Sequence, residues 1–212
     1  MIIPKSIKSI NGYTFYNCTK LKSVVFLNES SLMFIGSGSF LNCLNLESIS
    51  IPKFVKSINN YTFFNCLKLR SILIPNLVES IGKGAFAISG IESIEFSNGP
   101  SLKSIGSNAF FSCNFLKSFS IFSTSLDSIE SYAFAFCMSF THFSAGFPGI
   151  IGVWLSLIGD YAFAYCANLV SISILGNADS IKSHAFSFCY NLRKFDYYGS
   201  RKPKTISTIF FF

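Results

Sequence analysis

An internal repeat is the feature of this sequence that most constrains its fold. A phenylalanine preceded by a small residue recurs eight times, and consecutive copies are separated by 25, 23, 23, 24, 24, 29 and 23 residues. These anchor phenylalanines are Phe15, Phe40, Phe63, Phe86, Phe110, Phe134, Phe163 and Phe186. A unit of about 23 residues that recurs along a whole chain is typical of a solenoid, in which each copy is one coil and packs only on its neighbours.

Each copy carries the same apolar positions around its anchor. An isoleucine stands five residues before every anchor, from Ile10 to Ile181. After the anchor comes the pattern Leu-x-x-Ile-x-Ile, whose period-two alternation is typical of one face of a short strand. Because such a strand cannot bury its apolar face alone, we expect the strands of successive copies to stack about 4.8 Å apart in a parallel sheet.

The rest of each copy is expected to form turns. Glycine or asparagine follows the invariant isoleucine in six copies, where we predict a turn residue with positive φ. These residues are Asn11, Gly36, Asn59, Gly82, Gly106 and Gly159. The predicted fold class is a repeat solenoid of about eight repeats, with a parallel β-sheet on its concave face and short helical turns or irregular coil on the other. We assign residues 1–200 to the repeat domain and 201–212 to a partial repeat or tail.

These columns resemble the BspA-like class of leucine-rich repeats, whose unit is Leu-x-x-Ile-x-Ile-Pro-x-x-Val-x-x-Ile-Gly-x-x-Ala-Phe-x-x-Cys. The match is close over residues 51–66 and 74–86, and it departs where Glu130 and Lys182 replace the turn glycine. The resemblance covers residues 3–198 and implies a non-enzymatic, protein-binding module, with cell-surface adhesion as one role. The alternative is an intracellular interaction scaffold, or a repeat fragment without independent function.

Composition narrows the classes of partner. The net charge is +7, but lysine and arginine are scattered along the chain, so we expect no nucleic-acid binding. Arg201, Lys202 and Lys204 are predicted to lie in a solvated tail. Residues 1–5 lack the features of a signal peptide, and the longest apolar stretch, 145–158, is interrupted by glycine, proline and serine. We expect no membrane-spanning segment, and the cell surface is implied by the resemblance alone.

Both ends of the sequence stop inside a repeat. Residues 1–4 match the end of a strand, and residues 206–209 repeat the spacing of residues 7–10. Neither end shows a polar capping unit, although solenoids need such caps for solubility. We therefore expect apolar end faces and, through them, self-association.

Seven cysteines form a column of their own, three residues after an anchor phenylalanine. They are Cys18, Cys43, Cys66, Cys113, Cys137, Cys166 and Cys189, and Ser89 takes their place in the fourth copy. One thiol per coil, replaceable by serine, indicates a small packing residue. The coil spacing still allows disulfides between neighbouring copies. Zinc sites need clustered Cys-x-x-Cys or Cys/His pairs, which the sequence lacks, so we expect neither metal nor cofactor.

The two histidines occupy columns filled by other residues in other copies. His184 stands where tyrosine is common, and His142 stands where serine is common, so we interpret both as repeat variants. Cys189 and His184 form the nearest candidate for a nucleophile and base in sequence. Because the cysteine is already explained by its column, we do not expect an enzyme.

The outward surface of the strands is the predicted partner-binding site. Its first exposed column holds Lys22, Glu47, Arg70, Glu92, Lys117, Thr141, Val170 and Arg193. A serine-rich column follows, and stacking would align both into ladders; an ordinary solvated face is the alternative. The insertion at residues 146–154 is a second candidate, in which Trp154 is either an interaction hot spot or part of an apolar bulge over the core.

Overall fold

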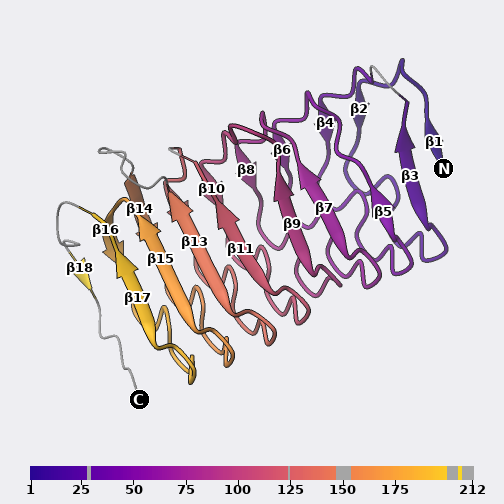
Figure 1. The fold of residues 1–212 in the computed structure, drawn as a ribbon. Coiled ribbons are helices and arrows are strands. Elements are labelled where there is room, and N and C mark those ends of the chain that lie inside the picture. Colours follow the sequence, from indigo (N-terminus) through magenta and orange to yellow (C-terminus); the bar gives the residue numbers. More distant parts are fainter. Residues whose placement is uncertain (28–29, 124, 147–153, 200–204, 207–212) are drawn as a thin grey trace.

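The computed structural model describes residues 1–27, 30–123, 125–146, 154–199 and 205–206, and every regular element among them is a β-strand (Figure 1). The chain winds as a solenoid whose coils stack along one axis, with two rows of strands on different sides. We number the coils by their anchors, from coil 1 with Phe15 to coil 8 with Phe186. This architecture confirms the predicted parallel solenoid.

Two rows of parallel strands form two walls of the solenoid. The front wall consists of β1 (Ile2–Ile3), β3 (Ser23–Phe26), β5 (Ser48–Ile49), β7 (Ser71–Ile74), β9 (Ser93–Phe96), β11 (Ser118–Ile121), β13 (His142–Gly146), β15 (Ser171–Leu175) and β17 (Lys194–Tyr197). The back wall consists of β2 (Ser9–Ile10), β4 (Phe34–Ile35), β6 (Ser57–Ile58), β8 (Ser80–Ile81), β10 (Ser104–Ile105), β12 (Ser128–Ile129), β14 (Trp154–Ile158), β16 (Asn177–Ile181) and β18 (Thr205–Ile206).

Equivalent residues of neighbouring coils are paired in register. In the front wall Phe119 pairs with Phe143, and in the back wall Ile105 pairs with Ile129. The back wall is one seven-stranded sheet from β6 to β18 beside the pair β2–β4. The front wall is divided into β1-β3-β5, β7-β9 and β11-β13-β15-β17, so its sheet is interrupted between β5 and β7 and between β9 and β11.

A third wall, which we call the turn wall, joins each back-wall strand to the next front-wall strand, as in residues 11–22 of coil 1. The expectation of short helical turns here was wrong. In every coil the residues two before and two after the anchor have positive φ, whereas a helix needs negative φ throughout. They are Tyr13, Asn17, Gly38, Asn42, Tyr61, Asn65, Gly84, Ile88, Asn108, Ser112, Tyr132, Phe136, Tyr161, Tyr165, His184 and Phe188.

Backbone hydrogen bonds explain this conformation of the turn wall. The anchor amide of Phe110 donates to the carbonyl of Ala133 in the next coil at 2.7 Å, and the Ser112 amide donates to Ala135 at 2.9 Å. The intervening Phe111 amide instead closes a turn within its own coil, to the carbonyl of Asn108 at 3.0 Å. Alternate residues thus bond between and within coils, and the turn wall becomes a third ladder along the stack.

The glycines after the invariant isoleucine have another function than the one predicted. None of Gly36, Gly82, Gly106 and Gly159 has positive φ, so that expectation was wrong. A Cβ atom on Gly36 would lie 2.3 Å from the amide nitrogen of Gly12, and one on Gly159 would lie 2.5 Å from that of Ser131. At these glycines the backbone of the preceding coil approaches too closely for a side chain, whereas the coils with Asn11, Asn59, Glu130 and Lys182 accept one.

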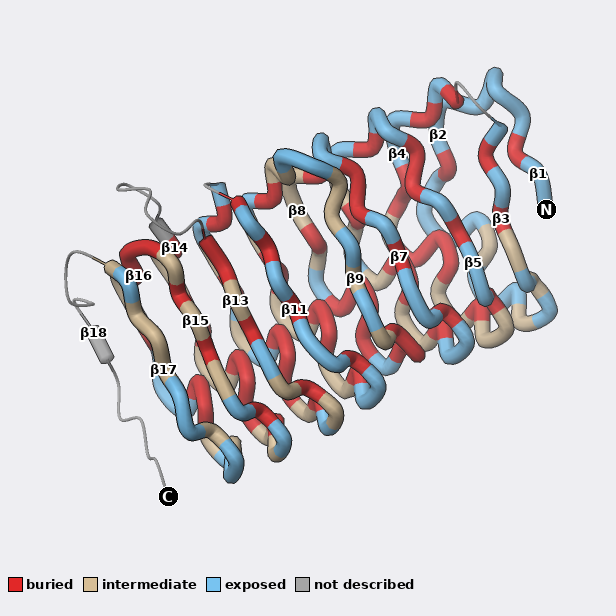
Figure 2. Tube along the Cα trace, in the orientation of Figure 1, coloured by how far each residue is buried: buried red, intermediate tan, exposed pale blue. Residues whose placement is uncertain are grey.

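The core is a column of stacked phenylalanine rings with aliphatic columns around it. Anchors of successive coils stack with centroids 5.0 to 5.6 Å apart, the shortest distance being between Phe110 and Phe134. Six of the eight anchors, from Phe40 to Phe163, are completely buried. Buried residues recur in successive coils, in both rows of strands and in the turn wall (Figure 2). This column accounts for much of the phenylalanine in the sequence.

Several predicted features lie outside the described residues. These are residues 147–153 of the insertion and, in the tail, residues 201–204 and 207–212, including Arg201, Lys202 and Lys204. Residues 205–206 form β18, which extends the back wall beside β16. In the first coil Ile2 and Tyr13 are 66% and 57% exposed, so apolar surface is present there. Self-association through such an end stays a prediction.

Candidate partner-binding surface

The outer face of the front wall is built by the strand alternation that the sequence predicts. In β7, Ser71 and Leu73 are exposed while Ile72 and Ile74 are buried, and β11 shows the same pattern. Side chains of a strand point alternately to its two faces, so every second residue enters the solvent-facing ladder. The serine column and its neighbours therefore lie side by side on one surface along the solenoid.

The charged residues of the predicted site lie directly before the front-wall strands. Lys22, Glu47, Arg70, Lys117 and Arg193 are exposed, and Glu92 is half-buried. Backbone hydrogen bonds tie most neighbours together, as between the Glu47 amide and the Lys22 carbonyl at 2.8 Å. Trp154, the remaining candidate, begins β14 in the back wall and so does not belong to this surface.

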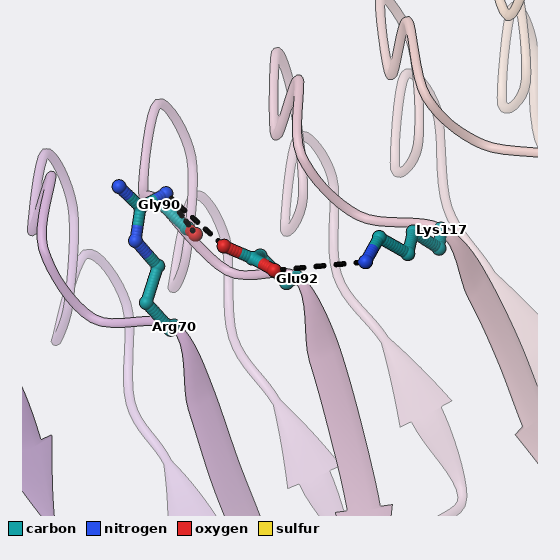
Figure 3. A network of polar contacts seen from close by, with 4 residues as sticks. All are labelled: Arg70, Gly90, Glu92 and Lys117. Carbon is teal, nitrogen blue, oxygen red and sulfur yellow. Dashed lines mark hydrogen bonds and ion pairs between the residues drawn. The ribbon is translucent and has the colours of Figure 1, made fainter.

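Three of these six charged side chains contact one another. Arg70 Nη1 lies 3.5 Å from Glu92 Oε1, and Lys117 Nζ lies 3.7 Å from Glu92 Oε2 (Figure 3). The Arg70 guanidinium also donates to the carbonyl of Gly90 at 3.4 Å and lies 4.9 Å from the centre of the Phe115 ring. Such exposed ion pairs contribute at most about 1 kcal/mol. Their main effect is that the Glu92 carboxylate already has two cationic neighbours.

Two hollows open on the front wall at the interruptions of its sheet. The first, of about 380 Å³, lies over β3, β5, β7 and β9, and Val25 and Leu73 in its lining are 47% and 50% exposed. The second, of about 520 Å³, lies over β9 and β11 and is lined by Ser120 and by Phe122, which is 57% exposed. Glu95 lines both hollows. The sequence indicated the columns but not these hollows.

A further hollow, of about 460 Å³, lies on the turn wall. It is lined by Tyr161, Tyr165, His184, Ser187, Phe188, Cys189 and Tyr190. The Tyr161 ring stacks on Tyr132 at 5.0 Å and on His184 at 4.9 Å. The Tyr165 ring likewise has a stacked neighbour 4.4 Å away on each side. Both faces of each ring are thus used within the fold, and His184 continues a structural stack, as expected of a repeat variant.

The cysteine column is held by one repeated hydrogen bond. Each thiol from the second coil onward donates to the carbonyl of the anchor phenylalanine in the preceding coil, as Cys113 Sγ does to Phe86 at 3.0 Å. All seven cysteines are free. Where serine replaces cysteine, Ser89 Oγ lies 3.5 Å from Cys113 Sγ. These contacts agree with the predicted packing role.

Burial suppresses the nucleophilicity of these thiols. It raises the pKa of Cys43 to about 11 and that of Cys113 to about 12, and it raises the pKa of Cys189 well above its usual range. The Cys189 thiol is already engaged with the Phe163 carbonyl at 3.1 Å, and His184 Nδ1 lies 3.1 Å from Ser187 Oγ. A protonated, hydrogen-bonded thiol is a poor nucleophile, because the thiolate is the reactive form.

Native thiol labelling should therefore show one fast cysteine. Cys18 is exposed, whereas the thiols from Cys43 to Cys166 are buried. At pH 8 a thiol with a pKa of about 11 is only about 0.1% thiolate. With iodoacetamide we expect one equivalent to react quickly and the others only after denaturation. Cys18→Ser should remove the fast phase, and fast labelling of Cys189 in that variant would contradict this assignment.

Within the described residues, no three or more histidine, cysteine, aspartate or glutamate side chains are grouped so that they could hold a metal ion. The described part of the chain also contains no helix long and apolar enough to span a bilayer. The remaining chemistry of the surface is thus hydroxyl groups, scattered charge and a few half-exposed apolar side chains.

Comparison with known proteins bears on the whole length of the chain. The family described as BspA type leucine-rich repeat region, with six copies, matches residues 1–115, 33–150 and 92–212. The chain belongs to this BspA-type family. The resemblance that the repeat columns suggested is thereby confirmed. No curated protein matches the BspA-type chain.

Two solved structures resemble the BspA-type chain. A leucine-rich repeat protein from Bacteroides ovatus is 27% identical with a TM-score of 0.50, over 89% of this chain and 58% of that one. The T. pallidum leucine-rich repeat protein is 24% identical with a TM-score of 0.59, over 91% of this chain and 77% of that one. The chain thus spans little more than half the length of the Bacteroides ovatus structure. Both likenesses support the solenoid fold.

Proposed function

We propose that this BspA-type chain is a non-enzymatic protein-binding module that contacts its partner through the outer face of the front wall. The observation that carries the proposal is the coincidence of two hollows with three half-exposed apolar side chains, Val25, Leu73 and Phe122, in a surface otherwise made mostly of serines and charged residues. The core of a protein interface is more apolar than the rest of a protein's surface. Small serines let a partner approach closely.

The turn wall is the weaker candidate for the same role. The faces of its aromatic rings are stacked on one another, so a partner would contact mainly the ring edges. The front-wall hollows are lined by fewer aromatic rings than the turn wall. Their side chains Val25 and Leu73 are not part of a ring stack, and about half of each is open to solvent. Removing such exposed aliphatic surface from water is favourable by about 25 cal/mol per Å², and this gain is set against the entropy lost on association.

A matched pair of substitutions tests which wall binds. Leu73 on the front wall and Leu67 on the turn wall belong to the same coil and are 50% and 46% exposed. We expect Leu73→Arg to reduce retention of partner proteins on the immobilised chain by about tenfold or more, because it places a charge in the first hollow. Leu67→Arg should leave retention unchanged. Loss of binding in the second variant alone would move the site to the turn wall.

The compartment in which this surface works is a separate question. The family resemblance implies a cell-surface adhesin, and an intracellular scaffold could use the same front wall. Labelling intact cells with a reagent that does not cross membranes separates the two roles. Labelled chain supports the adhesin, and chain that is labelled only after lysis supports the scaffold.

A further inference from the structure

The first front-wall hollow combines aliphatic surface with carboxylates. We call it the acidic groove and define it by Val25, Glu47, Ser50, Leu73 and Glu95, which all line it. Its volume of about 380 Å³ equals the space of about a dozen water molecules, enough for one long side chain and some solvent. The groove is therefore large enough to receive a side chain of a partner.

The carboxylates of Glu47 and Glu95 in this groove differ from that of Glu92 in their contacts with lysine and arginine. Glu92 is held between Arg70 and Lys117 at 3.5 and 3.7 Å. Among the residues that the structure describes, no lysine or arginine nitrogen lies within 4.0 Å of a carboxylate oxygen of Glu47 or Glu95. In a chain of net charge +7, the groove thus presents two carboxylates that have no ion-pair partner among the described residues.

The sign of these charges selects the partner. An acidic or purely apolar segment in the groove would desolvate the two carboxylates without compensating them, which is costly. A long cationic side chain satisfies both parts of the lining, since its aliphatic stem can cover apolar surface while its charged head meets the carboxylates. Arginine fits best, because its planar guanidinium forms paired hydrogen bonds with carboxylates.

We propose that the acidic groove receives an arginine side chain of the partner protein, with the stem on Val25 and Leu73 and the guanidinium on Glu47 or Glu95. This inference rests on the proposed function of the front wall and names the chemistry of its partner. It makes Glu47 and Glu95 specificity-determining residues. Glu92, on the same wall, is not one of them.

Two synthetic peptides test the proposal directly. One alternates leucine and arginine over eight residues, and the other carries neutral citrulline in place of each arginine. In fluorescence anisotropy titrations at 50 mM salt, we expect the arginine peptide to bind the whole chain at least about tenfold more tightly than the citrulline peptide. Equal affinity for both peptides would overturn the proposal.

Charge-removing variants then locate the site. The double variant Glu47→Gln/Glu95→Gln should weaken binding of the arginine peptide by about tenfold or more, whereas Glu92→Gln should leave it within about twofold. Both changes remove carboxylates from the same wall, so general electrostatic attraction would weaken with either. Equal losses in the two variants would overturn the inference. Thermal unfolding of each variant confirms that these exposed substitutions leave the fold intact.

The two proposals fail in different ways. If Leu73→Arg abolishes partner retention while the double variant retains the partner fully, the front wall binds but its groove does not take a cation. If neither variant affects retention, the front wall itself is not the contact surface. A competition experiment with 5 mM calcium adds a further test. If Ca²⁺ displaces the arginine peptide only from chains that retain Glu47 and Glu95, the groove binds cations.

Discussion

Replacing Phe110 by alanine is expected to lower the free energy of unfolding by about 3–5 kcal/mol. The Phe110 ring is completely buried and stacks between Phe86 at 5.3 Å and Phe134 at 5.0 Å. It also contacts the Phe119 ring at 5.8 Å. Alanine would leave a cavity that spans the junction of three coils and would remove the ring–ring contacts on both sides. A urea titration followed by circular dichroism measures the loss.

Ser120→Ala is the control for this experiment. Ser120 is exposed on the front wall of the same coil, and its replacement should cost less than about 0.5 kcal/mol. Because coils stabilise one another only through their interfaces, Phe110→Ala is also expected to broaden the transition as the two halves of the stack begin to unfold separately. Equal losses in the two variants would show that the inner and outer faces have been exchanged.

The columns of the core were predictable from the sequence because each coil must present the same apolar positions to its neighbours. Ile10 and its seven counterparts stand at one fixed distance before the anchor, and the back wall is built on them. The repeat pattern indicates one strand per coil and does not reveal this second strand. A two-residue strand such as Ser57–Ile58 is too short for alternation to reveal it.

The conformation of the turn wall was harder to predict because the residues at its positive-φ positions become less typical of positive φ along the chain. Glycine and asparagine, as at Gly38 and Asn42, are the residue types most often found with positive φ. Their presence at both positions of one coil argues against a helical turn there. In later coils Tyr161 and Tyr165 occupy the same places, although bulky residues rarely adopt positive φ. Ladder hydrogen bonds and ring stacking with neighbouring coils hold these residues in that conformation, and such support comes from the stack, not from local sequence.

The candidate surface, too, was predictable from the sequence only in part. The repeat spacing placed Glu47, Arg70 and Glu92 in one exposed column, and in the structure Glu47 and Arg70 are exposed and Glu92 is half-buried. Which carboxylate takes the available cations depends on side-chain conformations, and Glu92 contacts both Arg70 and Lys117. The hollows depend in turn on where strand pairing is interrupted. Neither property has a counterpart in the repeat pattern, so the acidic groove emerges only from the folded chain.

Raising the pH is expected to unfold the chain through its cysteine column. Burial raises the pKa of Cys43 from its ordinary 9.0 to about 11 and that of Cys113 to about 12, and it raises the pKa values of Cys66, Cys137 and Cys189 as well. The folded chain then binds more thiol protons than the unfolded chain, so stability falls as pH rises above 9. Each such thiol costs up to about 1.4 kcal/mol per pH unit between its ordinary pKa and its folded-state pKa, so the column lowers stability steeply in this range.

Cys113→Ser isolates the contribution of one thiol, since Ser89 shows that the column accepts a hydroxyl group. Urea titrations of both chains at pH 7.5 and pH 10, with a reductant present, give the loss of unfolding free energy on alkalinisation. Tyrosine and lysine titrate in both chains, so their effects cancel in the comparison. The wild type should lose about 1 kcal/mol more than the variant, because only its unfolded state releases the proton of residue 113 at pH 10. Equal losses would mean that this thiol ionises as readily in the folded coil as in the unfolded chain.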